Sequence, residues 1–171
     1  MKIFLLFLTL VILQRLSELL LAKKNERTVR SEGAVEYDAG GYKVIVLMHM
    51  AFLVSFTAEY FLLGRSLSPY WLPLVCVFVA AQLLRYWAIR SLGKFWNTRI
   101  LIVPGERLVT KGPYKYLRHP NYVSVVIEIA VIPLIFSCYI TAAVFTVLNL
   151  LALRRRIHIE EGALSSLEKP L

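Results

Sequence analysis

The sequence predicts an all-α fold, an integral membrane helical bundle of about five transmembrane segments. Of the 171 residues, 58% are hydrophobic and the mean hydropathy is +0.63, well above the values of soluble domains. The apolar residues form blocks, and several blocks reach the roughly 20 residues that an α-helix needs to cross about 30 Å of hydrocarbon. The chain length corresponds to a single domain, residues 1–171.

Three blocks have the length of one crossing each: residues 3–22, 43–63 and 70–92. The first block is longer than the apolar part of a signal peptide, contains Arg15 and Glu18, and lacks a small-residue cleavage site. We therefore expect it to be retained as a helix.

A fourth apolar run, residues 121–153, is too long for one crossing and just long enough for two short ones. Pro133 can kink a helix, and residues 137–139 can form a turn. The last two segments are therefore expected to form a helical hairpin. Ile157, Glu160 and Leu164 recur at helical spacing beyond it. This spacing predicts a cytoplasmic C-terminal helix that continues from the last crossing.

Charged side chains inside the apolar blocks need a partner or a route to the surface. Arg15 and Glu18 are three residues apart on one helix and can pair. Glu59 lies near a block end and can reach the interface, and Arg85 can extend its guanidinium to the inner surface. Glu128 lies two turns into the hairpin, where it either pairs with a basic side chain or lines a cavity.

The net charge of +9 is explained by topology without a nucleic-acid partner. Basic residues cluster after the first block, after the third block and after the hairpin, whereas only Lys2 precedes the first block and only Arg65 separates the second from the third. Positively charged loops stay cytoplasmic. We expect the N-terminus outside the cell and the C-terminus inside. The Cys and His residues lack metal-ligand spacing, so no metal is expected.

The longest non-apolar stretch, residues 93–118, leads into the hairpin. Residues 99–103 and 107–109 are expected to be short extended pieces around a Pro104-Gly105 turn. The motif that follows, residues 112–122, reads Gly-Pro-Tyr-Lys-Tyr-Leu-Arg-His-Pro-Asn-Tyr. So many cations and aromatic rings beside hydrocarbon indicate a functional site.

About forty residues later comes a second motif, residues 156–164, which reads Arg-Ile-His-Ile-Glu-Glu-Gly-Ala-Leu. Together the two motifs resemble the paired signature of the isoprenylcysteine carboxyl methyltransferase family, membrane enzymes that use S-adenosylmethionine. The resemblance implies a cofactor-binding part over residues 94–168 at the cytoplasmic surface. The residues that it assigns to the cofactor are Gly112, Tyr116, Arg118, His119, Asn121, Tyr122, Glu160 and Glu161.

The chemistry of S-adenosylmethionine fits these residue types. Glu160 or Glu161 can accept hydrogen bonds from the ribose hydroxyls or the ammonium group. Arg118 or Arg156 can bind the carboxylate, and His119 with the neighbouring tyrosines can stack on adenine or face the sulfonium. The expected reaction is an in-line displacement that depends on holding donor and acceptor collinear. Arg156 is the candidate orienting residue, and Glu128 is the candidate base for a neutral acceptor.

The acceptor is expected to enter from the bilayer and to carry a long apolar tail. The chain resembles short bacterial members of the family, which places it in the bacterial cell membrane among membrane lipids. A lipophilic small molecule such as a long-chain alkylpyrone, methylated on oxygen, is the expected substrate. The alternatives are carboxyl methylation of isoprenylcysteine, a nicotinamide-dependent reductase that shares the Arg-His-Pro-Asn-Tyr motif, and a non-catalytic membrane scaffold.

Overall fold

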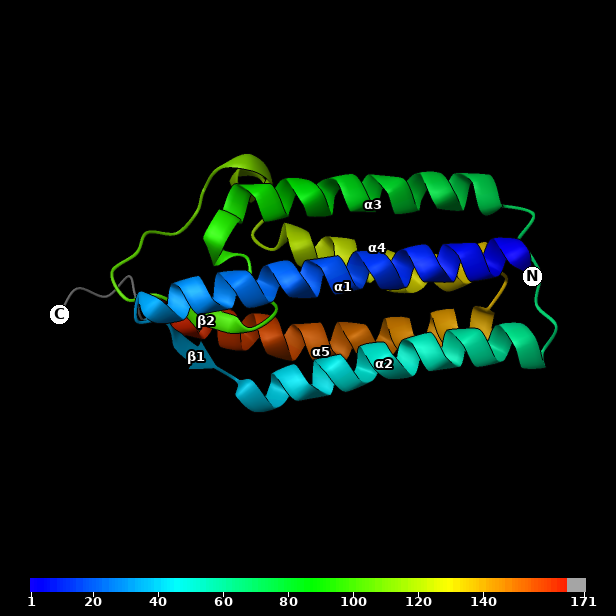
Figure 1. The fold of residues 1–171 in the computed structure, drawn as a ribbon, viewed down its shortest axis with the longest axis horizontal. Helices are drawn as coiled ribbons and strands as arrows, with labels where there is room; N and C mark the ends of the chain where they lie inside the picture. The colour runs from blue at the N-terminus through cyan, green and yellow to red at the C-terminus, as the bar shows by residue number, and fades with distance from the viewer. Residues whose placement is uncertain (166–171) are drawn as a thin grey trace.

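Five α-helices lie side by side and alternate in direction in the computed structural model, which describes residues 1–165 (Figure 1). A two-stranded ribbon and two short 3-10 helices lie at one end of the bundle, called here the ribbon end. In chain order the elements are α1 (Lys2–Ser31), β1 (Val35–Tyr37), α2 (Ala39–Leu62), α3 (Trp71–Leu92), η1 (Gly93–Phe95), β2 (Ile100–Ile102), η2 (Gly112–Lys115), α4 (Pro120–Ile135) and α5 (Tyr139–Ser165).

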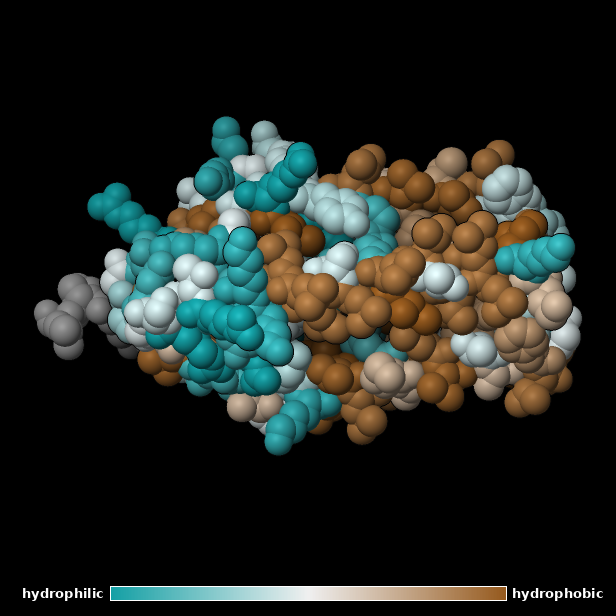
Figure 2. Space-filling model, in the orientation of Figure 1, coloured by the Kyte–Doolittle hydropathy of each residue, from teal (hydrophilic) through white to brown (hydrophobic). Residues whose placement is uncertain are grey.

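Three of these helices, α1, α2 and α3, are long and apolar enough to cross a membrane. The predicted five crossings are therefore supported for three segments. Helix α4 is apolar but has only 16 residues, or about 24 Å at 1.5 Å per residue. Exposed leucines cover the bundle away from the ribbon end, and Figure 2 shows this hydrophobic surface beside the hydrophilic ribbon end. Such a surface suits a membrane protein.

The predicted hairpin is confirmed. Helices α4 and α5 are joined by a tight turn in which the amide of Cys138 donates to the carbonyl of Pro133 at 2.9 Å and Ser137 has a positive φ of 56°. Helix α5 then continues without a break from Tyr139 to Ser165. The last segment and the predicted C-terminal helix are thus one helix, whose predicted residues 166–168 lie outside the described part of the chain.

Glu59 does not extend to the interface as expected. It is buried and accepts hydrogen bonds from the backbone amides of Ile140 (3.2 Å) and Thr141 (2.7 Å), the first residues of α5. Amides in the first turn of a helix have no partner within the helix, so a carboxylate there satisfies them. Glu59 therefore ties α2 to the start of α5. Beside it Phe4, Tyr60 and Phe136 belong to one aromatic core cluster.

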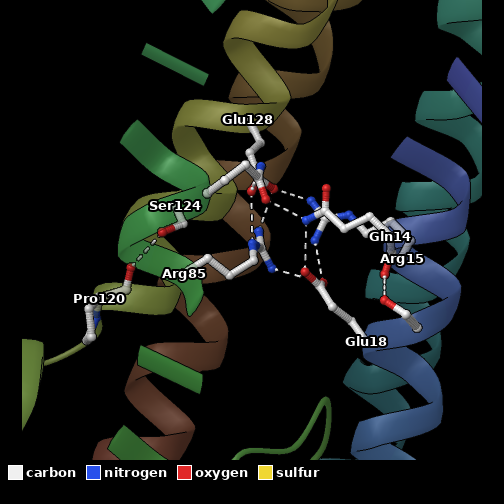
Figure 3. A network of polar contacts seen from close by, with 9 residues as sticks. Gln14, Arg15, Glu18, Arg85, Pro120, Ser124 and Glu128 are labelled. Carbon is white, nitrogen blue, oxygen red and sulfur yellow. Dashed lines mark hydrogen bonds and ion pairs between the residues drawn. The ribbon is translucent and has the colours of Figure 1, made fainter. Parts of the chain in front are cut away.

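A network of buried charges joins α1, α3 and α4 (Figure 3). Arg85 Nε donates to Glu128 Oε1 at 2.8 Å, and Arg15 also binds Glu128. Arg15 pairs with Glu18 at 2.9 Å, as its spacing predicted. Arg85 is buried, so the prediction that it reaches the surface is wrong. The two cations, Arg15 and Arg85, balance the charge of the two carboxylates, Glu18 and Glu128, so the network is neutral.

The ribbon positions the end of α5. Strands β1 and β2 are antiparallel, with Val35 opposite Ile102. The extended piece predicted at residues 99–103 is therefore present, but its partner is β1, and residues 107–109 form no strand. Glu36 in β1 accepts hydrogen bonds from Arg30 and Arg99. Partial burial opposes ionisation, but these two hydrogen bonds outweigh it and lower the pKa of the Glu36 carboxyl.

Candidate functional site

A cavity of about 550 Å³ lies at the ribbon end, enclosed by the stretch between α3 and α4, the start of α4 and the end of α5. We call it the site cavity. Its lining includes most of the polar side chains that the sequence assigned to the cofactor: Arg118, His119, Asn121, Tyr122, Arg156, Glu160 and Glu161. The two motifs, about forty residues apart in the chain, therefore share one cavity.

The start of α4 presents two aromatic rings to this cavity. Pro120 occupies the first helical position, where its missing amide hydrogen costs no hydrogen bond, and His119 precedes it. The rings of His119 and Tyr122 stack with centroids 5.2 Å apart and planes inclined by 16°. This pairing orients both rings with little freedom.

Tyr122 is the junction between α4 and α5. Its hydroxyl donates to Glu160 and accepts from Arg156 Nε at 2.8 Å. Arg156 also donates from Nη2 to the carbonyl of Thr98 at 2.8 Å, and its side chain is buried. Arg156 thus holds together Tyr122 and the loop before β2, and the orienting role expected of it stays a prediction. It has less freedom than Arg118 to bind a ligand carboxylate.

Glu161 collects the second set of contacts. It pairs with Arg118 at 3.2 Å, and its Oε1 lies 3.4 Å from Nε2 of His119. The Nδ1 atom of the same imidazole lies 3.8 Å from Glu160. The Arg118 side chain is 86% exposed, so it can turn toward a ligand at small cost. Two carboxylates, an imidazole and a cation therefore converge at the cavity.

Three buried polar atoms of cavity-lining residues have no hydrogen-bond partner within the described residues: Trp96 Nε1, Asn97 Oδ1 and Asn121 Oδ1. A buried polar group without a partner costs about 1–3 kcal/mol. These atoms are buried within the wall of the cavity, so they are unpaired polar groups of the wall and do not by themselves indicate a ligand.

Trp96 and Asn97 were not among the sequence-predicted residues. Their loop is held by Asn25 of α1, whose Nδ2 donates to the carbonyls of Gly93 (3.1 Å) and Trp96 (2.8 Å). An aromatic residue beside an amide in a loop before the main motif was the only signal available. The contact with α1 that places them has no trace in the local sequence.

Tyr114 also lines the cavity, next to Glu160. Burial and the nearby Glu160 carboxylate raise the pKa of the Tyr114 phenol. The phenol therefore stays protonated and can donate a hydrogen bond into the cavity at any physiological pH. Within residues 1–165, no three His, Cys, Asp or Glu side chains are grouped to hold a metal ion.

Two predicted cofactor residues are not brought to the cavity. Gly112 has a φ of +61°, and a Cβ at this position would lie 2.0 Å from Ser91 Oγ. Its lack of a side chain therefore permits close packing on α3, not the close approach of a ligand. Tyr116 is 74% exposed and is not part of the cavity lining.

Glu128 is also absent from the cavity lining, and its candidate role as a base is not supported by its surroundings. It is completely buried and is bound by Arg15, Arg85 and Gln82, the last at 2.6 Å. A carboxylate held by two guanidinium groups is a poor proton acceptor. The sequence left open whether Glu128 pairs with a basic side chain or lines a cavity, and in the structure it pairs with Arg15 and Arg85.

A second hollow of about 480 Å³, called here the apolar groove, lies between α4 and α5. Its lining residues are His119, Tyr122, Val123, Val126, Ile127, Leu150, Leu153, Arg154 and Ile157. His119 and Tyr122 line both hollows, so the polar cavity and the apolar groove meet at this pair of rings.

Comparisons with known proteins agree with the geometry. A model of the isoprenylcysteine carboxyl methyltransferase family matches residues 73–166. A relative from Bacillus subtilis (strain 168), named Uncharacterized protein YpbQ, is 43% identical over 161 residues, which cover 94% of this chain and 96% of the relative. An uncharacterized protein of Haemophilus influenzae is 26% identical over 154 residues, 90% of each chain. No solved structure matches.

Proposed function

Because this chain belongs to the isoprenylcysteine carboxyl methyltransferase family, we propose that it transfers a methyl group from S-adenosylmethionine to an oxygen atom of a lipophilic acceptor. The observation that carries the proposal is the polar site cavity meeting the apolar groove at His119 and Tyr122. A methyl donor and an amphiphilic acceptor need two adjoining sites of this contrasting polarity.

The cavity residues fit the functional groups of the cofactor. When bound, S-adenosylmethionine supplies an electrophilic methyl group on a sulfonium. Glu160 and Glu161 can accept hydrogen bonds from its ammonium or ribose hydroxyls, and the exposed Arg118 can bind its carboxylate.

The apolar groove fits the acceptor tail. Of its nine lining residues, only His119 and Arg154 are basic, and the other seven have aliphatic or aromatic side chains. Two of these seven, Val123 and Leu150, are also exposed on the outer surface of the bundle. An acceptor can therefore enter sideways from lipid. No carboxylate lies among the described residues that line the groove, whereas His119 lines it and can accept a proton from a neutral acceptor. The expected acceptor is one that is already ionised, such as an acidic enol of a long-chain alkylpyrone, which needs no base.

A carboxylate on an isoprenylated cysteine shares these properties and is the second candidate acceptor. The nicotinamide alternative shares the Arg-His-Pro-Asn-Tyr motif, but the family model that matches this chain is that of a methyltransferase. A scaffold without catalytic activity would have no need for a polar cavity that adjoins an apolar groove.

The binding test compares S-adenosylhomocysteine with NADPH by isothermal titration calorimetry on the purified full-length protein in detergent. We expect S-adenosylhomocysteine to bind and NADPH not to bind. Glu161→Gln should weaken the binding, whereas Glu106→Gln is the matched carboxylate control, because Glu106 also lines the cavity but pairs with Lys94 at 3.8 Å. Binding of NADPH alone would overturn the proposal.

The acceptor is then identified by mass spectrometry after incubation with labelled S-adenosylmethionine and a lipid extract of the source organism. We expect the label in a small lipophilic molecule. Label found only in protein-bound prenylcysteine would show that the second candidate acceptor is correct. Cofactor binding without any labelled product in either fraction would contradict the transferase assignment.

A further inference from the structure

The part of the 112–122 motif that does not line the site cavity lies beside α3, with Pro113 buried and with Lys115 and Tyr116 exposed. A Cβ at Gly112 would meet the side chains of Ser91 and Trp87, so this glycine lies directly against the last turns of α3. Lys111 precedes Gly112 in the chain, and Arg90 precedes Ser91. The contact between Gly112 and Ser91 therefore brings Lys111 and Arg90 to the same region. Lys115 closes the short η2 helix, which packs on α3.

The depth of this region in the membrane can be read along α3. Leu83 is 67% exposed, as expected of a side chain in hydrocarbon. One turn later Trp87 is 49% exposed, and aromatic side chains of this kind mark the membrane interface. Arg90 follows after a further turn and is also exposed. The highly exposed ring of Tyr116 gives the adjoining segment a second interfacial aromatic side chain.

Three cations at this level have no counter-charge among residues 1–165. Arg90, Lys111 and Lys115 are exposed and make no ion pair with any described residue. The sequences around them, residues 86–95 and 107–118, contain no Asp or Glu. We call these three side chains the basic patch. Figure 2 shows hydrophilic side chains at this end of the bundle, next to the hydrophobic surface.

We propose that the basic patch binds the phosphate headgroup of an anionic phospholipid in the adjoining leaflet, with Trp87 and Tyr116 seated at the interface. The charge of the patch complements an anionic headgroup, and its depth is that of lipid phosphates. Each Lys or Arg near an anionic leaflet contributes about five-fold in binding. Three such groups therefore discriminate strongly between anionic and zwitterionic lipids.

The basic patch and the site cavity are connected, because neighbouring residues of one chain segment belong to each. Thr110 and Tyr114 line the cavity, while Lys111 and Lys115, one residue further along in each case, belong to the patch. A lipid that holds the two lysines on the outer side therefore also holds one wall of the cavity on the inner side.

The test measures lipid binding to the purified full-length protein in detergent by native mass spectrometry, with phosphatidylglycerol and phosphatidylcholine titrated separately. We expect phosphatidylglycerol to bind at least about ten-fold more tightly. The triple variant Arg90→Gln, Lys111→Gln, Lys115→Gln should bind both lipids equally. The matched control Arg30→Gln, Lys94→Gln, Arg155→Gln removes three cations at the same end that already pair with carboxylates, and it should keep the preference.

Equal loss of the preference in both triple variants would overturn the proposal, because it would show a non-specific effect of net charge. Inorganic phosphate that displaces phosphatidylglycerol at millimolar concentration would also overturn it, in favour of a free-anion site. If the triple variant does not stay folded, Lys115→Gln alone should lower phosphatidylglycerol affinity about five-fold. No cofactor or acceptor is present, so the result does not depend on the proposed methyl transfer.

Discussion

At the scale of single residues, one phenol carries much of the candidate site. The Tyr122 ring stacks on His119, and its hydroxyl lies between Arg156 and Glu160. Each of these contacts joins a different segment, so Tyr122 connects the motif before the hairpin with the helix after it. The spacing of the motifs brings these residue types to one site, but only the folded chain shows which atom donates to which.

Replacing Tyr122 by Phe keeps the stacked ring and removes the hydroxyl. Arg156 then loses the acceptor of its Nε, and Glu160 loses a donor. Because buried polar groups are left without partners, we expect S-adenosylhomocysteine to bind about ten-fold more weakly, a cost of about 1.4 kcal/mol, measured by calorimetry. The matched control is Tyr116→Phe, on an exposed ring outside the cavity. Equal effects of the two changes would contradict the role given to Tyr122.

The residues that sequence reasoning misplaced share a physical reason. Gly112 and Tyr116 belong to the correct motif, but the short η2 helix turns successive side chains to different sides. Tyr114 therefore faces the cavity while Tyr116 faces outward. Sequence reasoning missed Trp96 because its position depends on a hydrogen bond to Asn25, which lies 71 residues earlier, in α1.

At the scale of the helices, charge pairing decides how α1 joins the bundle. Apolar contacts give little preference for association in lipid, because the lipid tails are equally apolar. The paired Arg15, Glu18, Arg85 and Glu128 therefore supply a specific contact between α1, α3 and α4. The sequence identified Glu128 as an unusual residue, but it could not say which helix would provide the cations.

Glu128→Gln should destabilise the protein by about 3–5 kcal/mol, because the two buried guanidinium groups lose their shared counter-charge. The double variant Arg85→Met, Glu128→Leu removes one charge of each sign and leaves Arg15 paired with Glu18. We expect it to melt at a higher temperature than Glu128→Gln in detergent, measured by thermal unfolding.

The same double variant separates structure from catalysis. If Glu128 only joins helices, a folded double variant still transfers the methyl group to its acceptor. Methyl transfer that is lost while S-adenosylhomocysteine binding and the melting temperature are retained would return Glu128 to the role of a base.

At the scale of the whole molecule, the ribbon end combines the site cavity, the ends of α3 and α5, and most of the positive charge. The alternating helix directions place the loops after α1 and α3 and the end of α5 together at this end (Figure 1). The opposite end carries only the short connections after α2 and α4 and the N-terminus. This asymmetry is the physical basis of the proposed orientation, with the site cavity on the cytoplasmic side.

Single cysteines test that orientation. In a background with Cys76 and Cys138 replaced by Ala, Ser66→Cys lies in the connection between α2 and α3, and Lys111→Cys lies at the ribbon end. We expect a membrane-impermeant maleimide to label Ser66→Cys in intact cells and Lys111→Cys only after lysis, because the positive end stays inside. The reverse labelling pattern would show that the site cavity faces outward.

The sequence by itself determined the helical class, the hairpin and the pairing of the two distant motifs. The first two follow from hydropathy and from turn-forming residues, which are local properties, and the third follows from the resemblance of the two motifs to one family signature. Only the tertiary structure decided that Glu128 pairs with Arg15 and Arg85, that β1 is the partner of β2, and that Trp96 joins the cavity. Each of these depends on which surfaces of separate helices and strands meet, and that is set by packing across the whole bundle.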